Sequence, residues 1–214
     1  MDEKCTEEIA SKEELIDLIL EEEWMMFNNV INIGGRASCQ DDPETFEIMR
    51  RSQFDSWNRL LLESYLSDLI GAMYEDRNLL AEKYAYMMEY SFPQEFEEIK
   101  NSLPEISDTK KLLIRKITDM HLEWRKEGMK KYPKLFGKGR PERISDESFG
   151  RVSVESYLLG ELSTMSERSL GFYEAYINEL KSIGNNLPVL ILESTVKRYG
   201  YSSIEDAEMK AGAI

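Results

Sequence analysis

The chain has 214 residues, of which 42% are hydrophobic and 32% are charged, so it can bury a sizeable core and is not disordered. Its 41 acidic and 27 basic residues give a net charge of -14, which would repel phosphate backbones and anionic lipid surfaces. We therefore expect no nucleic-acid partner and no membrane partner. No apolar run approaches the roughly 18 residues that a membrane-spanning helix needs.

The N-terminal residues and the cysteines both favour a cytoplasmic protein. Residues 1–10 are acidic and resemble neither a secretory signal nor a basic transit peptide, so we expect a mobile acidic tail there. Cys5 and Cys39 form neither a CxxC motif nor a disulfide framework. A reducing compartment is therefore the simplest location.

The first predicted helix begins at a clear start signal. Ser11 is followed three residues later by Glu14, which is the spacing of a capping box. Apolar residues then recur at intervals of three and four along one face: Leu15, Leu18, Ile19, Met26 and Val30. Gly34 and Gly35 permit positive φ angles, and we expect them to end this helix.

The remaining chain is also predicted to be helical. Asp42 and Pro43 are an N-cap and a first-turn proline, so they mark the start of a second helix. Further helices are predicted over residues 59–76, 78–90, 93–101, 108–131, 153–183, 188–199 and 203–210, of which 153–183 should be broken. Strands are poorly supported because no segment alternates strictly for long, and the β-branched run "LPVLILEST" is interpreted as helix.

The fold class follows from these elements. The longest irregular segment, residues 136–151, is either a linker or an ordered loop packed on the helices. Neither alternative requires a second domain. The sequence therefore predicts one all-α domain of about eight helices over residues 11–214.

The connection "INIGGRASCQDD", residues 31–42, carries more polar residues than capping requires. One interpretation is functional: Arg36 and Arg50 would clamp a carboxylate or phosphate, and Cys39 would be a nucleophile activated by a nearby arginine and a helix N-terminus. Asp41 and Asp42 oppose that activation. The alternative is structural, with arginines pairing with the acidic surface and Cys39 acting as a small buried residue. A nucleotide loop is excluded, because a helix precedes the glycines and no phosphate-binding glycine motif is present.

A later segment, "SVESYLLGELSTMSERSL", supplies more candidates. Tyr157, Glu161 and Thr164 share one helical face, and Gly160 between them would allow another helix or a ligand to approach closely. A buried Glu161 would need a partner, for which arginine is the natural choice. Metal chemistry is not predicted, because the only histidine, His121, lacks carboxylates at ligand spacing; we interpret it as a surface or core histidine.

Several of these segments carry a family resemblance. The segments "NIGGRASCQDDPETFEIMRRSQF", "LLAEKYAYMMEYSFP", "SVESYLLGELSTMSERSL" and "VKRYGYSSIEDAE" resemble an uncharacterised bacterial domain-of-unknown-function family, the DUF4125-type proteins. The resemblance covers nearly the whole chain. It implies a prokaryotic-type soluble protein, and it brings no activity, cofactor or catalytic residue, so the cofactor is unknown.

The leading hypothesis is a polar pocket for a small anionic molecule, with acid/base or cysteine chemistry if the protein is an enzyme. The catalytic candidates are Cys39, Glu161 and Tyr157, with Glu161 as general acid or base. The substrate-binding candidates are Arg36, Gln40, Arg50, Gln53, Glu82 and Tyr84. We expect Arg36, Arg50 and Glu161 to surround one cavity. The alternative is a non-catalytic interaction module that binds a partner protein through its acidic surface.

Overall fold

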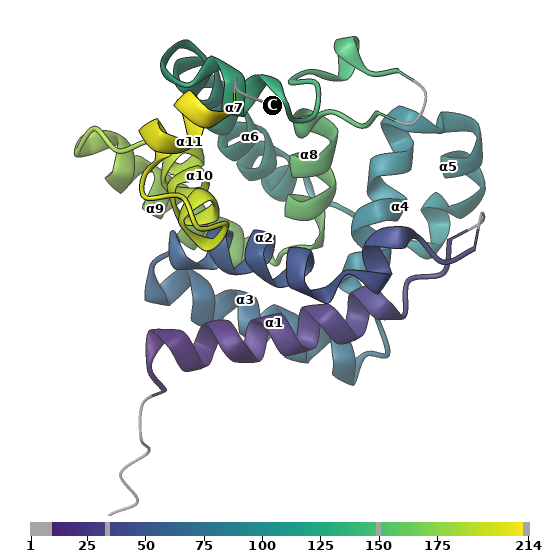
Figure 1. Cartoon of the computed structure of the whole chain (residues 1–214). Coiled ribbons are helices and arrows are strands. Elements are labelled where there is room, and N and C mark those ends of the chain that lie inside the picture. The colour runs from purple at the N-terminus through teal and green to yellow at the C-terminus, as the bar shows by residue number, and fades with distance from the viewer. Residues whose placement is uncertain (1–9, 33–34, 149–150, 212–214) are drawn as a thin grey trace, which may run out of the picture.

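The computed structural model describes residues 10–32, 35–148 and 151–211, and over these residues the protein is all-helical, as predicted (Figure 1). The described residues contain 11 α-helices and one isolated β-bridge between Ser148 and Arg151. Almost all of the predicted N-terminal tail lies outside the described residues. None of the described helices combines the length and the apolar character required to cross a bilayer.

The N-terminal half consists of α1 (Lys12–Asn28), α2 (Pro43–Asp55), α3 (Arg59–Tyr74), α4 (Leu79–Ser91) and α5 (Pro93–Ile99), followed by the short 3-10 helix η2 (Lys100–Ser102). The predicted capping box forms at the start of α1, where the Ser11 hydroxyl accepts from the Glu14 backbone N–H and the Glu14 carboxylate accepts from that of Ser11. Asp42 caps α2 as predicted, by accepting from the backbone N–H of Thr45 at 3.0 Å.

The predicted end of the first helix was wrong. Helix α1 ends at Asn28, and Gly35, with a φ of 87°, lies in the connection that follows, whereas Gly34 lies outside the described residues. The 3-10 helix η1 (Ser38–Asp41) explains the early end. From η1 the buried side chain of Gln40 donates to the carbonyls of Phe27 and Val30 at 2.9 and 3.0 Å, so a distant side chain satisfies carbonyls at the end of α1.

The C-terminal half accounts for the difference in helix number. It contains α6 (Asp108–Lys131), α7 (Pro133–Gly137), α8 (Val154–Thr164), α9 (Glu167–Ser182), α10 (Leu187–Arg198) and α11 (Ile204–Lys210). The predicted 153–183 helix breaks at Met165, whose ψ of 149° is extended, and Ser166 then caps α9. Helix α7 was not predicted: it follows the predicted 108–131 helix and includes the first two residues of the segment predicted to be irregular. The "LPVLILEST" run is helical in α10, as predicted.

The segment between α7 and α8 is an ordered loop, so the linker alternative was wrong for its described residues. It includes the 3-10 helix η3 (Ile144–Asp146) and packs against α6 and α8. The Arg125 guanidinium of α6 donates to Glu142 at 2.7 Å, and the Val154 backbone N–H donates to the Pro141 carbonyl at 2.8 Å. These contacts fix the loop beside the start of α8.

The main core is built on the inward faces of α1, α3, α6, α8 and α9. Its centre is aromatic: Trp57 contacts Phe54, Tyr65 and Tyr173 with ring centroids 5.2 to 5.6 Å apart. The predicted stripe on α1 was partly wrong, because Leu18 is 45% exposed. A smaller apolar cluster joins the C-terminal helices: Tyr132, Phe136, Val196, Ile204 and Ala207.

Helices α4 and α8 pack closely because Gly160 has no side chain. A Cβ atom at Gly160 would lie 2.7 Å from the backbone oxygen of Lys83 and 2.5 Å from Cγ of Met87, both in α4. The glycine that the sequence singled out for a close approach therefore meets a helix. It brings the residue after it, Glu161, next to Lys83.

We predict that Gly160→Ala lowers the free energy of unfolding by about 1–3 kcal/mol, because the added methyl group forces α4 and α8 apart. The matched control is Gly171→Ala in α9, where a Cβ would meet nothing within 4 Å. This control should stabilise the protein by roughly 0.5–1 kcal/mol, the helix-interior preference for alanine. Urea unfolding of both variants tests the prediction, and equal effects of the two substitutions would contradict it.

Candidate functional site

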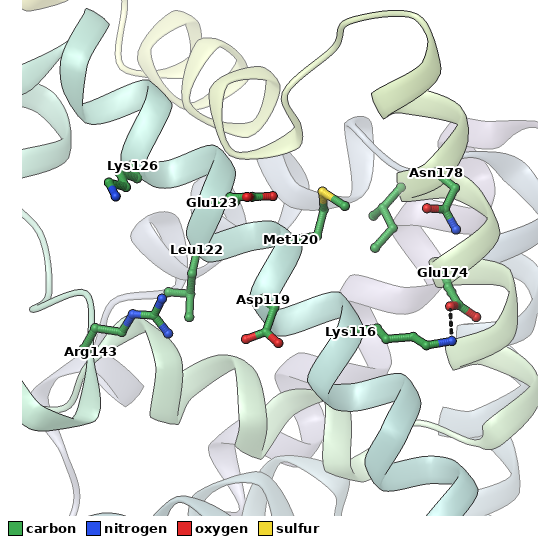
Figure 2. Close-up of a pocket in the computed structure, with 10 residues that line it drawn as sticks. Lys116, Asp119, Met120, Leu122, Glu123, Lys126, Arg143, Glu174 and Asn178 are labelled. Atoms are coloured by element: carbon green, nitrogen blue, oxygen red, sulfur yellow. Dashed lines mark hydrogen bonds and ion pairs between the residues drawn. The ribbon is translucent and has the colours of Figure 1, made fainter.

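Two sizeable hollows are candidates for a functional site. The first, of about 600 Å³, runs along α6 and α9 (Figure 2). Its charged residues are three cations and three carboxylates, and Lys116 and Glu174 already pair at 2.9 Å. The cations there, including Arg143, are surface residues, so this hollow has balanced and solvated charge and little to select a ligand.

The second hollow is a cavity of about 520 Å³ between α2, α4, α6, α8 and α10, closed on one side by the loop before α8. It gathers predicted site residues that are far apart in the sequence. Six of them line it: Cys39, Arg50, Gln53, Tyr84, Tyr157 and Glu161. This convergence makes it the candidate site.

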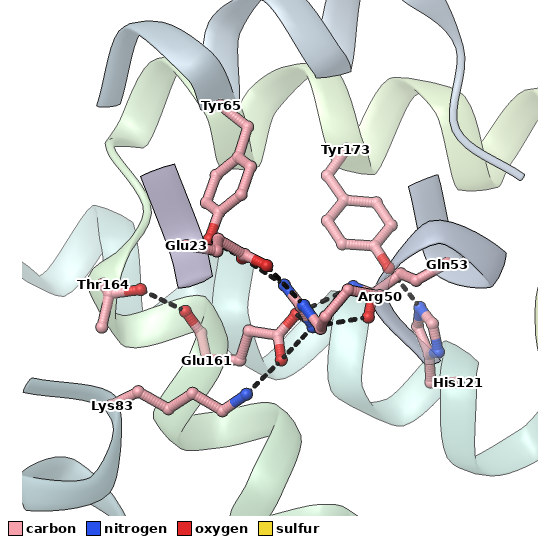
Figure 3. Close-up of polar contacts among 9 residues, drawn as sticks. All are labelled: Glu23, Arg50, Gln53, Tyr65, Lys83, His121, Glu161, Thr164 and Tyr173. Atoms are coloured by element: carbon pink, nitrogen blue, oxygen red, sulfur yellow. Dashed lines mark hydrogen bonds and ion pairs between the residues drawn. The ribbon is translucent and has the colours of Figure 1, made fainter. Parts of the chain in front are cut away.

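Arg50 of α2 organises the base of the cavity (Figure 3). Its Nε and Nη2 donate to the two carboxylate oxygens of Glu23 in α1 at 2.7 and 2.5 Å. Its Nη1 donates to Gln53 at 2.8 Å and to Glu161 at 3.2 Å. Glu23 is fully buried, so this bidentate pair is removed from solvent.

Lys83 completes the charge network. Its Nζ donates to Glu161 at 2.7 Å, and Gln53 donates to the other carboxylate oxygen of Glu161 at 2.8 Å. Tyr65 donates to Glu23 at 2.6 Å. Two buried cations therefore face two buried carboxylates, and the network is neutral as a whole.

The network holds its members in their charged forms. Burial alone would raise the pKa of Glu161, but Arg50 and Lys83 hold it well below its usual range. Burial alone would lower the pKa of Lys83, but the charge of Glu161 raises it above its usual value. Glu161 therefore has no proton to donate near neutral pH, and its oxygens are occupied, so its environment suits an anchor better than a general acid or base.

A neutral polar pair lies beside the network. His121 Nε2 is 2.9 Å from the hydroxyl of Tyr173, and both residues are buried. Burial lowers the pKa of His121 to about 4 and raises the pKa of Tyr173. Both side chains line the cavity uncharged at neutral pH.

The rim of the cavity carries a further cation. Arg140, in the loop before α8, is exposed and lies over the Tyr157 ring, with 5.0 Å between its guanidinium carbon and the ring centroid. Lys83 Nζ lies 3.6 Å from the same centroid. Arg140 donates to the Val152 carbonyl at 3.4 Å, and no carboxylate of the described residues pairs with it. Arg125, also at the cavity wall, is neutralised by Glu142.

Part of the cavity wall is aromatic, formed by Phe27, Phe46 and Tyr84. Phe27 and Phe46 stack with centroids 5.2 Å apart, and Tyr84 lies 6.4 Å from Phe27. Cys39 of η1 is exposed at the cavity edge, so the alternative of a small buried cysteine was wrong. The η1 segment, which gathers polar residues at this point, holds the thiol against the cavity.

Arg36, Gln40 and Glu82 do not line the cavity, so the expectation that Arg36 joins Arg50 and Glu161 was wrong. Arg36 finds nearer partners: it donates to Asp41 at 2.6 Å and to the Gln40 carbonyl at 2.6 Å. Gln40 joins η1 to the end of α1, as described above. Glu82 forms a bidentate pair with Arg77 at 2.8 Å.

The sequence analysis did not include Glu23 and Lys83 among the candidate site residues, although the position of each on its helix indicated a buried charge. Glu23 lies one turn from Ile19 and one turn from Phe27 on the buried face of α1, where an apolar residue is expected. Lys83 occupies the same kind of position on α4. A charged residue on the buried face of a helix requires an oppositely charged or hydrogen-bonding partner elsewhere in the fold. Arg125 and Arg140 left no such signal, because only the folded loop brings them to the cavity.

Among the described residues, no group of three or more His, Cys, Asp or Glu side chains is placed to hold a metal ion. No curated protein and no solved structure matches the chain. A family model described as "Protein of unknown function (DUF4125)" matches residues 13–209, which is nearly the whole chain, and the protein belongs to that family.

Proposed function

We propose that the cavity binds a small anionic molecule. The observation that carries the proposal is the charge of its wall: Arg50, Lys83, Arg125 and Arg140 face it, against the carboxylates of Asp42 and Glu161, in a protein of net charge -14. Once the pairings of Arg50, Lys83 and Arg125 with Glu23, Glu161 and Glu142 are counted, Arg140 is the wall cation without a carboxylate partner among the described residues, and its charge would attract an anion to this point.

The four cations differ in whether a carboxylate of the protein already pairs with them. Arg50, Lys83 and Arg125 are engaged by Glu23, Glu161 and Glu142, as described above. Among the described residues, Arg140 is the cavity cation that no carboxylate pairs with, so it can bind an anion, and Tyr157 beneath it would position the guanidinium. The phenol oxygens of Tyr84 and Tyr157 have no hydrogen-bond partner among the described residues, so they can bond to the same molecule.

The buried network supports binding more than catalysis. Its carboxylates and cations balance one another in charge and are joined by hydrogen bonds, so they give the cavity a rigid polar base. Cys39 presents an exposed thiol at the cavity edge, and any covalent catalysis at the site would use this thiol as the nucleophile.

We predict that Arg140→Glu weakens anion binding by at least about tenfold, the loss expected for a charge-assisted hydrogen bond. Arg140 is exposed, so the melting temperature of the free protein should change little. The probes are hexanoate, gluconate and inorganic phosphate, with hexylamine as the cationic counterpart of hexanoate. Calorimetric titration gives the affinities, and thermal melting reports stabilisation by each probe.

The control is Arg168→Glu, which makes the same charge change at an exposed residue of α9 that does not line the cavity. It should leave affinity unchanged. Binding that both substitutions weaken equally would indicate only a general charge effect. If no anion binds, the proposal fails, and an interaction module with an acidic surface becomes the better description.

A further inference from the structure

We infer that the ligand is an amphipathic monoanion, with one anionic head group at the rim and an apolar body inside the cavity. The inference rests on the proposed function and names the class of molecule that the site takes. Three features of the cavity carry it: the charge that is left over, the position of that charge, and the apolar character of the walls.

The charge count indicates a single negative charge on the ligand. At the base, Arg50 and Lys83 are balanced by Glu23 and Glu161, and at the wall Arg125 is balanced by Glu142. Within the part of the chain that the structure describes, Arg140 has a carbonyl and an aromatic ring as partners. Asp42 is engaged as the N-cap of α2, where the helix dipole offsets its charge. Arg140 can balance one negative charge on the ligand, so the second charge of a dianion would have no further described cation to pair with at this site.

The position of Arg140 places the head group. Arg140 is exposed, whereas the charge-balanced network of Arg50, Lys83 and Glu161 is buried at the base. An anionic group at the base would meet the carboxylate of Glu161, and the described cations there, Arg50 and Lys83, are already paired with carboxylates. The head group therefore lies at the rim, and the rest of the molecule extends inward.

The walls between the rim and the base are largely apolar. They are formed by side chains from five helices, among them Phe46, Leu80, Leu158, Pro188 and Ile191. A polyhydroxylated or highly phosphorylated body would lose its hydration there and find few hydrogen-bond partners. A hydrocarbon or aromatic body would gain from burial instead, and the flexible side chain of Met49 allows adjustment to its shape.

The test is a chain-length series on the unmodified protein. Hexanoate, octanoate and decanoate share one head group and differ only in methylene groups, each of which should raise affinity by about fourfold when buried. Gluconate has the same carbon number and charge as hexanoate but carries hydroxyl groups, and it should bind at least about tenfold more weakly. Hexylamine should not bind measurably.

A substitution in the cavity wall tests whether the apolar body of the ligand lies inside the cavity. Leu158→Asn on α8 should weaken decanoate binding by about tenfold or more and leave gluconate binding nearly unchanged. Leu112→Asn, at an exposed position of α6 outside the cavity, should change neither. Melting curves show whether each variant is folded, and the chain-length series does not depend on them.

The outcomes separate this inference from the proposed function. If gluconate or phosphate binds in a manner sensitive to Arg140→Glu but affinity is flat along the fatty-acid series, the inference fails and the anion site stands. If the series rises as expected but Leu158→Asn has no effect, the apolar body lies elsewhere and the inference also fails. If no anion binds at all, both fail together.

Discussion

Arg50→Ala should lower the free energy of unfolding by roughly 3–5 kcal/mol, the cost of removing one partner from a buried ion pair. Arg50 alone makes the bidentate contact with Glu23, which is 0% exposed, and it also donates to Glu161. Without it, two carboxylates face a single cation, Lys83. Urea unfolding at neutral pH, with circular dichroism as the probe, measures the loss.

The matched control is Arg51→Ala at the next position of α2. Arg51 also pairs with carboxylates, Asp17 at 2.5 Å and Glu47 at 3.2 Å, but both of these partners are exposed. Its loss should cost no more than about 1 kcal/mol, as for other surface pairs. If Arg50→Ala proved as mild as Arg51→Ala, the network would not be the rigid base that the binding proposal requires.

His121 should make the protein less stable as the pH falls from 6.5 towards 4. Burial lowers the pKa of His121 to about 4 in the folded protein, whereas the unfolded chain titrates near the ordinary value of 6.5. Between these values the unfolded state takes up a proton that the folded state refuses, so acid favours unfolding. The full effect is roughly 3 kcal/mol, of which about 2 kcal/mol is reached at pH 5.

The variant His121→Gln isolates this effect from other titrations. Carboxyl groups with lowered pKa values, such as Glu161, also lose their stabilising effect in acid, but they do so below their ordinary value of 4.5. Glutamine can still bond to the Tyr173 hydroxyl and does not titrate. Between pH 7 and pH 5, the free energy of unfolding of the parent protein should therefore fall by about 2 kcal/mol relative to that of the variant. Parallel pH profiles for the two proteins would show that His121 is not held neutral by burial.

The helices and their starts were determined by the sequence itself. Ser11, Asp42 and Ser166 each cap a helix by accepting a hydrogen bond from the backbone three residues ahead. Such contacts depend only on neighbouring residues, so a linear pattern contains all the information they need. For the same reason the all-α class could be predicted, whereas the break at Met165 could be placed only within a long segment.

The sequence also indicated that charges lie inside the protein. Arg50 and Glu161 were singled out on apolar helices, and Glu23 and Lys83 could have been by the same spacing. A charge on a buried face must have a partner, and that requirement follows from the helical spacing alone. The spacing does not say which partner is used.

Only the tertiary structure decided which charges meet. Arg36 and Arg50 looked alike in sequence, yet Arg36 pairs with Asp41 five residues away, while Arg50 reaches Glu161 across 111 positions. The second contact exists because Gly160 lets α8 pack against α4 and because Arg50 of α2 points toward Glu161. The contacts of the loop before α8 with α6 and α8 bring Arg140 to the rim, and the packing of separate helices brings their apolar side chains to the walls. A cavity is the space that packed helices leave between them, so it has no counterpart in the local pattern of any one of them.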